Sequence, residues 1–99
     1  MLVDFEDDGL RRLHEEPDFR LPQFGDELTR HFRKVAGAIV AATSELDLLA
    51  MRSLRFEKLQ GKRSGQHSLR LNQQWRLIVR LDQDDRGKVV MVIEVTDYH

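Results

Sequence analysis

The chain of 99 residues contains no cysteine, which excludes a disulfide framework, a thiolate nucleophile and a cysteine-based zinc site. The chain also has no long hydrophobic run, because the longest apolar stretch, Ala36 to Thr43, is far too short to span a bilayer. The first nine residues are acidic, which is the opposite of a secretory leader. We therefore expect a single domain over residues 1–99 that is cytoplasmic and has no membrane partner.

An overall positive charge is missing as well, since the formal net charge is −1. The distribution is uneven, however: residues 52–80 hold eight Lys or Arg and only one acid, Glu57, whereas the rest of the chain holds eight basic and sixteen acidic residues. A local basic surface can bind phosphate groups even on a nearly neutral protein. A solvated surface paired with the acidic segments would explain the same composition, and both interpretations stay open.

The N-terminal segment has the pattern of a short strand followed by a short helix. Residues 2–5 are predicted to form the strand. Asp7 or Asp8 is predicted to cap a helix that carries Leu10 and Leu13 and ends near Pro17. The following residues, up to Gly25, are predicted to form a loop.

A longer helix is predicted over residues 26–44. Apolar residues spaced by four, three, four and three positions form one helical face, which consists of Leu28, Phe32, Val35, Ile39 and Ala42. Arg30, Arg33 and Lys34 fall outside this face, and we expect them to face water. Residues 45–53 are predicted to form a short helical turn or a connection.

The hydrophobic period then changes to two, which is typical of strands. Residues 67–71 and 75–81 are predicted to form two strands joined by a tight turn over residues 72–74. A second hairpin turn is predicted over residues 82–88, followed by an almost unbroken apolar run over residues 89–95 that suggests a strand covered on both faces. The expected fold class is α+β, with an N-terminal strand and two main helices packed on an antiparallel sheet.

This alternation separates the apolar from the basic side chains. Trp75 lies on the apolar face of its strand, so we expect it to belong to the core rather than to stack on a base. His67 is expected to be a core-facing or edge-strand residue, and a catalytic or stacking role is the alternative. Arg70, Arg76 and Arg80 lie on the other parity. Since burying arginines against helices is costly, these three are expected to form a basic groove opposite the helices.

Several segments resemble the HigB-type toxins of the RelE superfamily. Residues 55–65 (RFEKLQGKRSG), 68–72 (SLRLN) and 74–77 (QWRL) are similar to the central signature of that family, and the final residues (EVTDYH) are similar to its common Asp-Tyr-His terminus. The N-terminal half is similar too, including Phe5 and the longer helix. The resemblance covers essentially the whole chain, and its specificity comes from the combination of motifs.

The resemblance implies a RelE-like fold and a ribosome-dependent endoribonuclease that cleaves messenger RNA in the ribosomal A site without a cofactor. It also implies a small helix-turn-helix antitoxin of the HigA type as the partner. Such an antitoxin binds both the toxin and operator DNA, so the chain would reach the operator only through it.

RNA cleavage without a metal uses the substrate's own 2′-hydroxyl group, a base, an acid and cations that stabilise the phosphorane. His99 is the candidate acid or base, because imidazole titrates near physiological pH and the terminal tripeptide matches the family. Alternatively, His99 is a frayed chain end with no role. Tyr98 is expected to stack on a base or to cap the core, and Asp97 to orient His99 or simply to end the strand.

Arg76 is the candidate transition-state stabiliser, because a guanidinium group can bind two phosphate oxygens. Arg70 is the second candidate and Arg80 the third. Cross-strand salt bridges with Glu94 or Glu57 are the competing explanation for these arginines. Glu57 stands where some HigB relatives have a histidine, so it is a candidate general base. Alternatively, the active site works without a residue in this role.

A second set of residues is predicted to hold the RNA backbone rather than to do chemistry. These residues are Arg55, Lys58, Lys62, Arg63 and Arg80. No metal role is predicted, because His14 and His31 lie on separate helices and lack ligand spacing.

Two other functions are compatible with the same pattern. One is a catalytically silent module that binds the antitoxin and acts in autoregulation. The other is a free RNA-binding protein unrelated to the ribosome, although the near-neutral net charge makes tight binding to naked RNA harder to explain. Loss of the terminal histidine and the sheet arginines should matter to an enzyme and not to a silent module.

Overall fold

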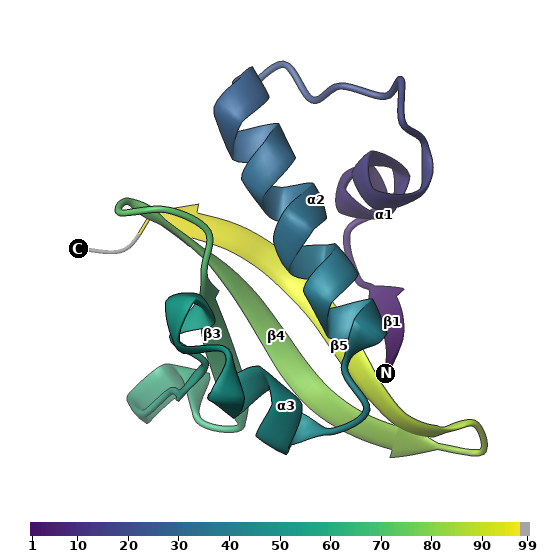
Figure 1. Ribbon diagram of the computed structural model, residues 1–99, viewed down its shortest axis with the longest axis vertical. Coiled ribbons are helices and arrows are strands. Elements are labelled where there is room, and N and C mark those ends of the chain that lie inside the picture. Colours follow the sequence, from purple (N-terminus) through teal and green to yellow (C-terminus); the bar gives the residue numbers. More distant parts are fainter. Residues whose placement is uncertain (98–99) are drawn as a thin grey trace.

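The computed structural model describes residues 1–97 and is an α+β structure with a five-stranded sheet. The first elements are β1 (Leu2–Phe5), α1 (Asp8–Glu15), α2 (Asp26–Ala41), α3 (Glu45–Ala50) and a 3₁₀ turn, η1 (Arg52–Leu54). The remaining elements are β2 (Glu57–Lys58), a second 3₁₀ turn, η2 (Gly61–Arg63), β3 (Gln66–Arg70), β4 (Trp75–Asp84) and β5 (Gly87–Asp97). The expected N-terminal strand and two main helices packed on a sheet are thus confirmed (Figure 1).

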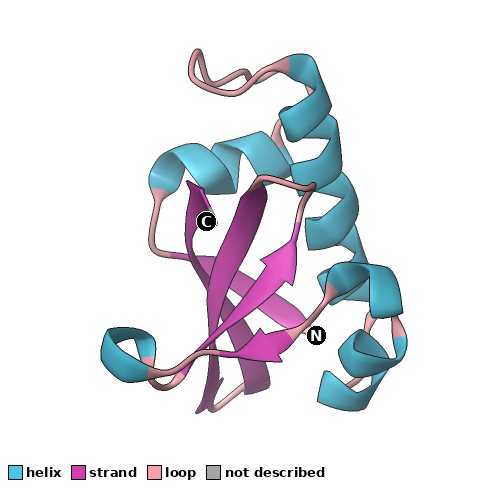
Figure 2. Cartoon of the chain, turned by 90° about the vertical axis from the view of Figure 1, so that its left-hand side faces the viewer, coloured by secondary structure: helices cyan, strands magenta, loops and turns pink. Residues whose placement is uncertain are grey.

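The strand order is β1-β5-β4-β3-β2, and every pair is antiparallel except β1 with β5. The parallel pair arises because α1 and α2 intervene in the chain between the first strand and the rest of the sheet. Figure 2 shows α2 along one side of the sheet, with η2 standing apart on the opposite side. Within the described residues, no helix is long and apolar enough to cross a membrane.

The hydrophobic core lies between the helices and one face of the sheet. All five residues of the predicted stripe on α2 are buried, and Leu10 and Leu13 of α1 join them. The sheet contributes Leu69 and Leu71, then Leu77 and Val79, then Val90 and Val92. Burial of one such side chain stabilises a fold by about 1.5–3 kcal/mol, so this stripe holds α2 on the sheet.

Helix α1 begins where the sequence predicted, because Oδ1 of Asp7 accepts a hydrogen bond from the backbone N–H of Leu10 (2.8 Å). Helix α2 ends at Ala41 rather than at Ser44. The carboxylate of Asp47 accepts from the backbone N–H and the hydroxyl of Thr43 (2.8 and 2.7 Å), which favours a turn into α3 instead of a further helical turn.

The prediction that Arg33 faces water was wrong. Its guanidinium group is half-buried and donates to the backbone carbonyl oxygens of Leu13 (2.9 Å), Glu16 (3.2 Å) and Phe19 (3.0 Å). These carbonyl groups lie at the end of α1 and in the loop after it, where the helix leaves them without intrahelical partners. Arg33 therefore fastens α1 and its loop to α2.

The apolar run of β5 is covered on both faces only in part. Val89, Val90 and Val92 are buried, whereas Met91, Ile93 and Val95 are partly exposed. Between Ile78 and Val79 the register against β5 shifts by one residue: Ile78 pairs with Glu94 and Val79 with Val92. This β-bulge lets Val92 and Val95 face the helices while Glu94 faces away from them.

His67 stacks on Phe56, with ring centroids 4.7 Å apart and an interplanar angle of 8°. Burial lowers the pKa of His67 below its ordinary value of 6.5, and its Nδ1 atom is buried without a hydrogen-bond partner among the described residues. His67 thus faces the core, which was one of the two expected positions, whereas the edge position is not observed because β3 lies between β4 and β2.

We predict that His67→Phe makes the protein less sensitive to acid. Because the pKa of His67 is depressed in the folded state, the unfolded state binds more protons, and stability falls as the pH drops through 6.5 towards the folded pKa. Urea unfolding at about pH 8 and about pH 5.5 measures this loss above the range in which most carboxylates titrate. The variant should lose less free energy of unfolding between these two values than the wild type, and an equal loss would contradict the assignment.

Candidate functional site at one end of the sheet

Arg70 at the end of β3 and Arg76 at the start of β4 lie directly opposite each other. Both guanidinium groups donate to the same acceptor, the carbonyl oxygen of Asn72, from Nε of Arg70 (3.2 Å) and from a terminal nitrogen of Arg76 (2.9 Å). Leu69 and Leu77 are buried under the helices, so the two arginines stand on the opposite parity of their strands. The Arg70 side chain also reaches a hollow that it shares with residues of α2. Two cations thus meet at one end of the sheet.

The turn between β3 and β4 fixes their position. Oδ1 of Asn72 accepts from the backbone N–H groups of Gln74 (2.9 Å) and Trp75 (2.8 Å), so the side chain replaces a backbone partner inside the turn. Nε2 of Gln74 then donates to Oδ2 of Asp97 (3.0 Å), the last described residue of β5. Asp97 pairs with Trp75 across the sheet, so three strands contribute polar groups to this end.

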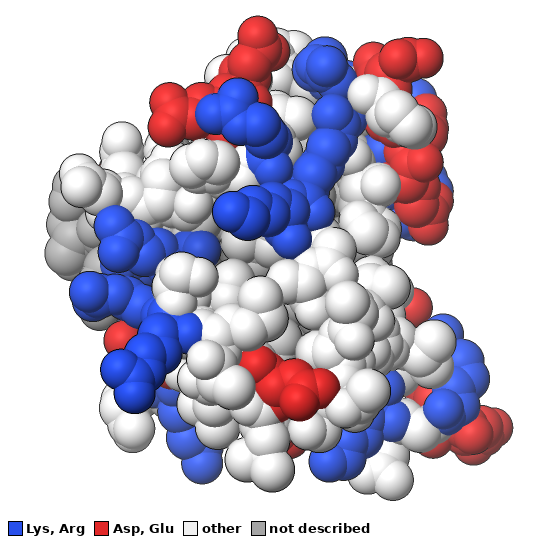
Figure 3. All heavy atoms as spheres, in the orientation of Figure 1, with Lys and Arg blue, Asp and Glu red and all other residues white. Residues whose placement is uncertain are grey.

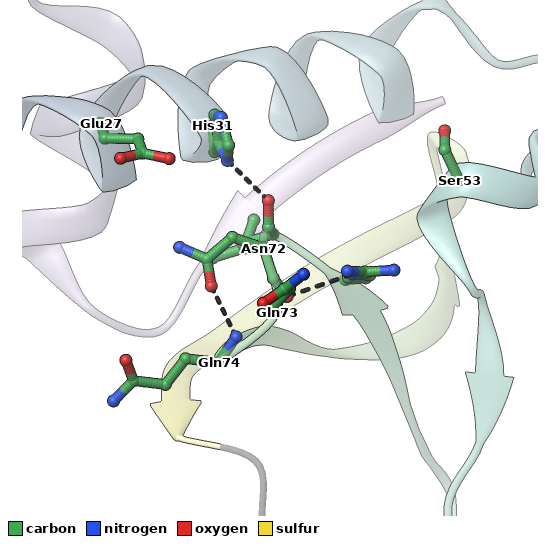
Figure 4. Close-up of a pocket in the computed structure, with 8 residues that line it drawn as sticks. Glu27, His31, Ser53, Asn72, Gln73 and Gln74 are labelled. Carbon is green, nitrogen blue, oxygen red and sulfur yellow. Dashed lines mark hydrogen bonds between the residues drawn. The ribbon is translucent and has the colours of Figure 1, made fainter.

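A hollow of about 650 Å³ opens beside the turn (Figure 4). It is lined by Glu27, His31, Ser53, Arg70, Leu71, Asn72, Gln73 and Gln74. His31 points from α2 toward the turn, and its Nδ1 atom donates to the carbonyl oxygen of Leu71 (2.8 Å), so this nitrogen carries a proton. The wall combines a cation, a carboxylate, amides and an imidazole, which can donate and accept hydrogen bonds.

Sequence reasoning missed part of this wall. Glu27, His31 and Ser53 are far from the turn in the chain, and no spacing connects them with it. The three polar residues of the turn were given no role of their own beyond a connection and the family signature, although a run of amide side chains between two arginine-bearing strands was a usable signal.

The centre of the outer sheet face is covered, which corrects the expectation of an open basic groove. Arg63 of η2 donates to Oε1 of Gln66 (2.9 Å) and pairs with Glu94, so its side chain crosses β4. Ile78 and Ser68 are only 2% exposed, although they face away from the helices. The salt bridge expected between Glu94 and a sheet arginine is thus made by Arg63 of η2.

Further along the same face, Arg80 is paired with acids. It donates from Nε to Oδ1 of Asp82 (2.8 Å) and approaches Oε1 of Glu6 (3.4 Å). The hydrogen bonds from Arg80 hold the pKa of Asp82 below its usual range. Arg80 is therefore partly neutralised, which lowers its contribution to a surface that attracts anions.

The other predicted RNA-binding residues lie toward the β2 edge. Arg55 adopts a left-handed conformation (φ 45°), which turns the chain from η1 into β2. Lys58 and Lys62 are exposed. Glu57 is exposed and pairs with Ser68, so it shares a face with Arg70 but lies two residues further along the sheet. Lys and Arg side chains gather over this part of the molecule, on the left of Figure 3.

The predicted catalytic residues Tyr98 and His99 lie outside the described residues; they are the two positions after Asp97 in the sequence. Within residues 1–97, no cluster of three or more His, Asp or Glu side chains is placed to hold a metal ion. The described part of the candidate site thus consists of Arg70, Arg76, Asp97 and the turn that joins them.

Comparison with known proteins identifies one family. Residues 3–99 match the model of the HigB-like toxins, described as RelE-like toxins of type II toxin–antitoxin systems. No protein of curated function matches the chain.

Solved structures show the same fold at low identity. A YoeB/ParE toxin from Agrobacterium tumefaciens is similar over 100% of both chains, with a TM-score of 0.59 and 14% identity. A YoeB–YefM complex from Staphylococcus aureus is similar over 100% of this chain and 98% of that one, with a TM-score of 0.59 and 17% identity. A heterotetrameric YoeB–YefM toxin–antitoxin complex from the same organism gives a TM-score of 0.54 at 17% identity with the same coverage.

We predict that Asn72→Ala destabilises the protein by about 1–3 kcal/mol, because the backbone N–H groups of Gln74 and Trp75 lose their acceptor. Urea unfolding measures the loss, and hydrogen exchange should show faster exchange at those two amides. Gln73→Ala is the matched control, since Gln73 is exposed in the same turn and none of the described hydrogen bonds involves it. Equal stability of the two variants would contradict the role given to Asn72.

Proposed function

The chain belongs to the HigB-like toxins, the RelE-like toxins of type II toxin–antitoxin systems, and we propose that it is an endoribonuclease that cleaves messenger RNA on the ribosome. The observation that carries the proposal is the convergence of Arg70, Arg76 and Asp97 at one end of the sheet. In the sequence, Asp97 is followed by Tyr98 and His99. This end offers cations to a phosphate group and polar side chains to a base.

In the proposed reaction the RNA supplies its own nucleophile. A base removes the proton from the 2′-hydroxyl, the 2′-oxygen attacks the adjacent phosphorus, and the bond from phosphorus to the 5′-oxygen breaks. An acid protonates the departing 5′-oxygen. The products are a 2′,3′-cyclic phosphate and a 5′-hydroxyl, and no metal or cofactor takes part.

The arginines are proposed to stabilise the phosphorane. Arg76 is the first candidate and Arg70 the second, since their guanidinium groups already share one carbonyl acceptor and can turn toward phosphate oxygens. We assign the acid to His99, with Asp97 orienting it and Tyr98 stacking on a base. Glu57 is the candidate base, because it shares the outer face with Arg70.

RNA backbone contacts are proposed for the exposed cations toward the β2 edge, namely Arg55, Lys58 and Lys62. Arg63 and Arg80 belong to the same proposal, but each would first have to exchange a carboxylate partner for a phosphate. Backbone contacts of this kind position the substrate without reading its sequence.

The proposed partner is a helix-turn-helix antitoxin of the HigA type, which would neutralise the toxin and carry it to operator DNA. The proposal is supported by the family, and two of the similar structures are toxin–antitoxin complexes. The proposed location is the cytoplasm, where ribosomes and messenger RNA are found.

We predict that induction of the wild-type chain arrests growth and produces cuts inside translated reading frames, mapped by primer extension. Arg76→Gln should lower the cleavage rate about a hundredfold to a thousandfold, because one transition-state donor is lost. His99→Ala should abolish the arrest. Lys88→Gln is the control, since Lys88 is an exposed cation at the other end of β5, and it should behave as the wild type.

Circular dichroism establishes that each variant is folded. If the wild type is folded yet harmless and no cuts appear, the chain is a silent partner module and the nuclease proposal fails.

We also predict that cleavage depends on the ribosome. Purified protein should cut a messenger RNA in a reconstituted translation mixture and leave the same naked RNA intact, because the near-neutral net charge gives little general affinity for RNA. Equal cleavage of the naked RNA would contradict ribosome dependence while leaving the nuclease assignment in place.

A further inference from the structure

A second hollow, of about 230 Å³, lies at the N-terminal end of α2. It is lined by Arg20, Asp26, Thr29, Arg30 and Arg33. It is distinct from the hollow beside the β3–β4 turn, which takes Glu27 and His31 from another flank of the same helix. Three of its five lining residues are arginines, which is an unusual concentration in a chain of net charge −1.

The three arginines lack carboxylate partners among the described residues. Arg33 donates only to backbone carbonyl oxygens, and so does Arg20, to those of Pro17 (3.0 Å) and Phe19 (3.0 Å). Carbonyl groups satisfy donors but do not neutralise a charge. Asp26 is the one acid in the lining, and it forms no salt bridge with them in the described part of the chain.

Five other arginines each form a salt bridge with at least one carboxylate: Arg11, Arg12, Arg63, Arg80 and Arg86. Arg52, Arg55 and Arg70 also form no salt bridge among the described residues, so what distinguishes this hollow is that three such arginines line one space. A half-buried cation such as Arg33 gains most from an anion, because it has already lost part of its hydration.

Two further groups in the same place lack partners. Thr29 is only 3% exposed, and its hydroxyl group has no hydrogen-bond partner among the described residues. Helix α2 begins beside it, and its N-cap residue, Gly25, provides no side chain to accept from the first backbone N–H groups. The hollow thus combines cations with unsatisfied donors, which is the chemistry that binds an oxyanion.

We propose that this hollow binds a phosphate group, held by Arg20, Arg30 and Arg33 together with the hydroxyl of Thr29 and the first turn of α2. Its source is either free phosphate or the backbone of an RNA, both of which present the same oxygens. The proposal does not depend on nuclease activity, because the site shares no residue with the one at the end of the sheet.

The test is a titration of the folded wild-type chain with inorganic phosphate, followed by ¹H–¹⁵N correlation spectra at constant ionic strength in chloride. The amides of residues 26–29 should shift and saturate. The double variant Arg20→Gln/Arg30→Gln should weaken this binding by about tenfold or more, since two charge-assisted donors are lost. Arg33 is left intact because it also holds α1 in place. Absence of a saturable shift, or an unchanged affinity in the double variant, overturns the proposal.

Two controls separate binding from folding. Arg52→Gln removes an exposed arginine elsewhere and should leave the affinity unchanged. Thr29→Val removes a buried hydroxyl without changing the side-chain shape, so the melting temperature in chloride should rise while phosphate affinity falls. A rise in melting temperature with unchanged phosphate affinity would show that the Thr29 hydroxyl does not take part in binding. Unchanged phosphate affinity in both Thr29→Val and the double variant would overturn the proposed site.

The source of the phosphate is decided by a second titration with a 2′-O-methyl RNA oligonucleotide, which cannot be cleaved through its 2′-oxygen. Shifts of the same four amides that compete with inorganic phosphate support an RNA backbone contact. Shifts with inorganic phosphate alone support a site for the free ion.

Discussion

The pairing of β4 with β5 is the constraint on which the rest of the structure depends. It runs from Trp75 opposite Asp97 to Asp84 opposite Gly87, and it joins the parallel strand β1 on one side to β3 and β2 on the other. The single register shift in this pair keeps Val92 and Val95 under the helices and turns Glu94 outward. Without the bulge, Glu94 would oppose Leu77 in the core, where an unpaired carboxylate is costly.

This pairing also determines how charge is distributed on the outer face. Glu94, turned outward, takes Arg63, and Arg80 is held by Asp82 and Glu6. The acidic residues thus neutralise the middle of the face and the end near the β4–β5 turn. Arg70 and Arg76 lie at the opposite end, where both donate to the carbonyl oxygen of Asn72. In this way a chain of nearly neutral net charge can concentrate cationic side chains in one region of its surface.

Helix α2 organises the other side of the molecule. One stripe of it is buried, one flank carries Glu27 and His31 beside the β3–β4 turn, and another carries Arg30 and Arg33 beside the loop after α1. The stripe holds the helix on the sheet, so both flanks keep a fixed distance from the strands. Rigid placement of polar groups on a packed helix is what allows two separate hollows to form on so small a domain.

The sequence by itself determined the main helices and strands and their apolar faces, but not the short strand β2 or the 3₁₀ turn η2. Apolar spacing of three to four residues in a helix, and of two in a strand, follows from the local geometry of the backbone. The stripe from Leu28 to Ala42 and the alternation around Leu69 and Leu77 could therefore be predicted from the sequence. The family signature at residues 55–77 was also recognisable in the sequence, and it indicated Arg70 and Arg76.

Only the tertiary structure decided which charged and polar groups meet. Arg33 with Leu13, Arg63 with Glu94, and His31 with Leu71 join residues 20 to 40 positions apart. A long polar side chain can satisfy its donors in many ways with similar free energy, and the choice among them is made by the packing of apolar surfaces that brings distant segments together.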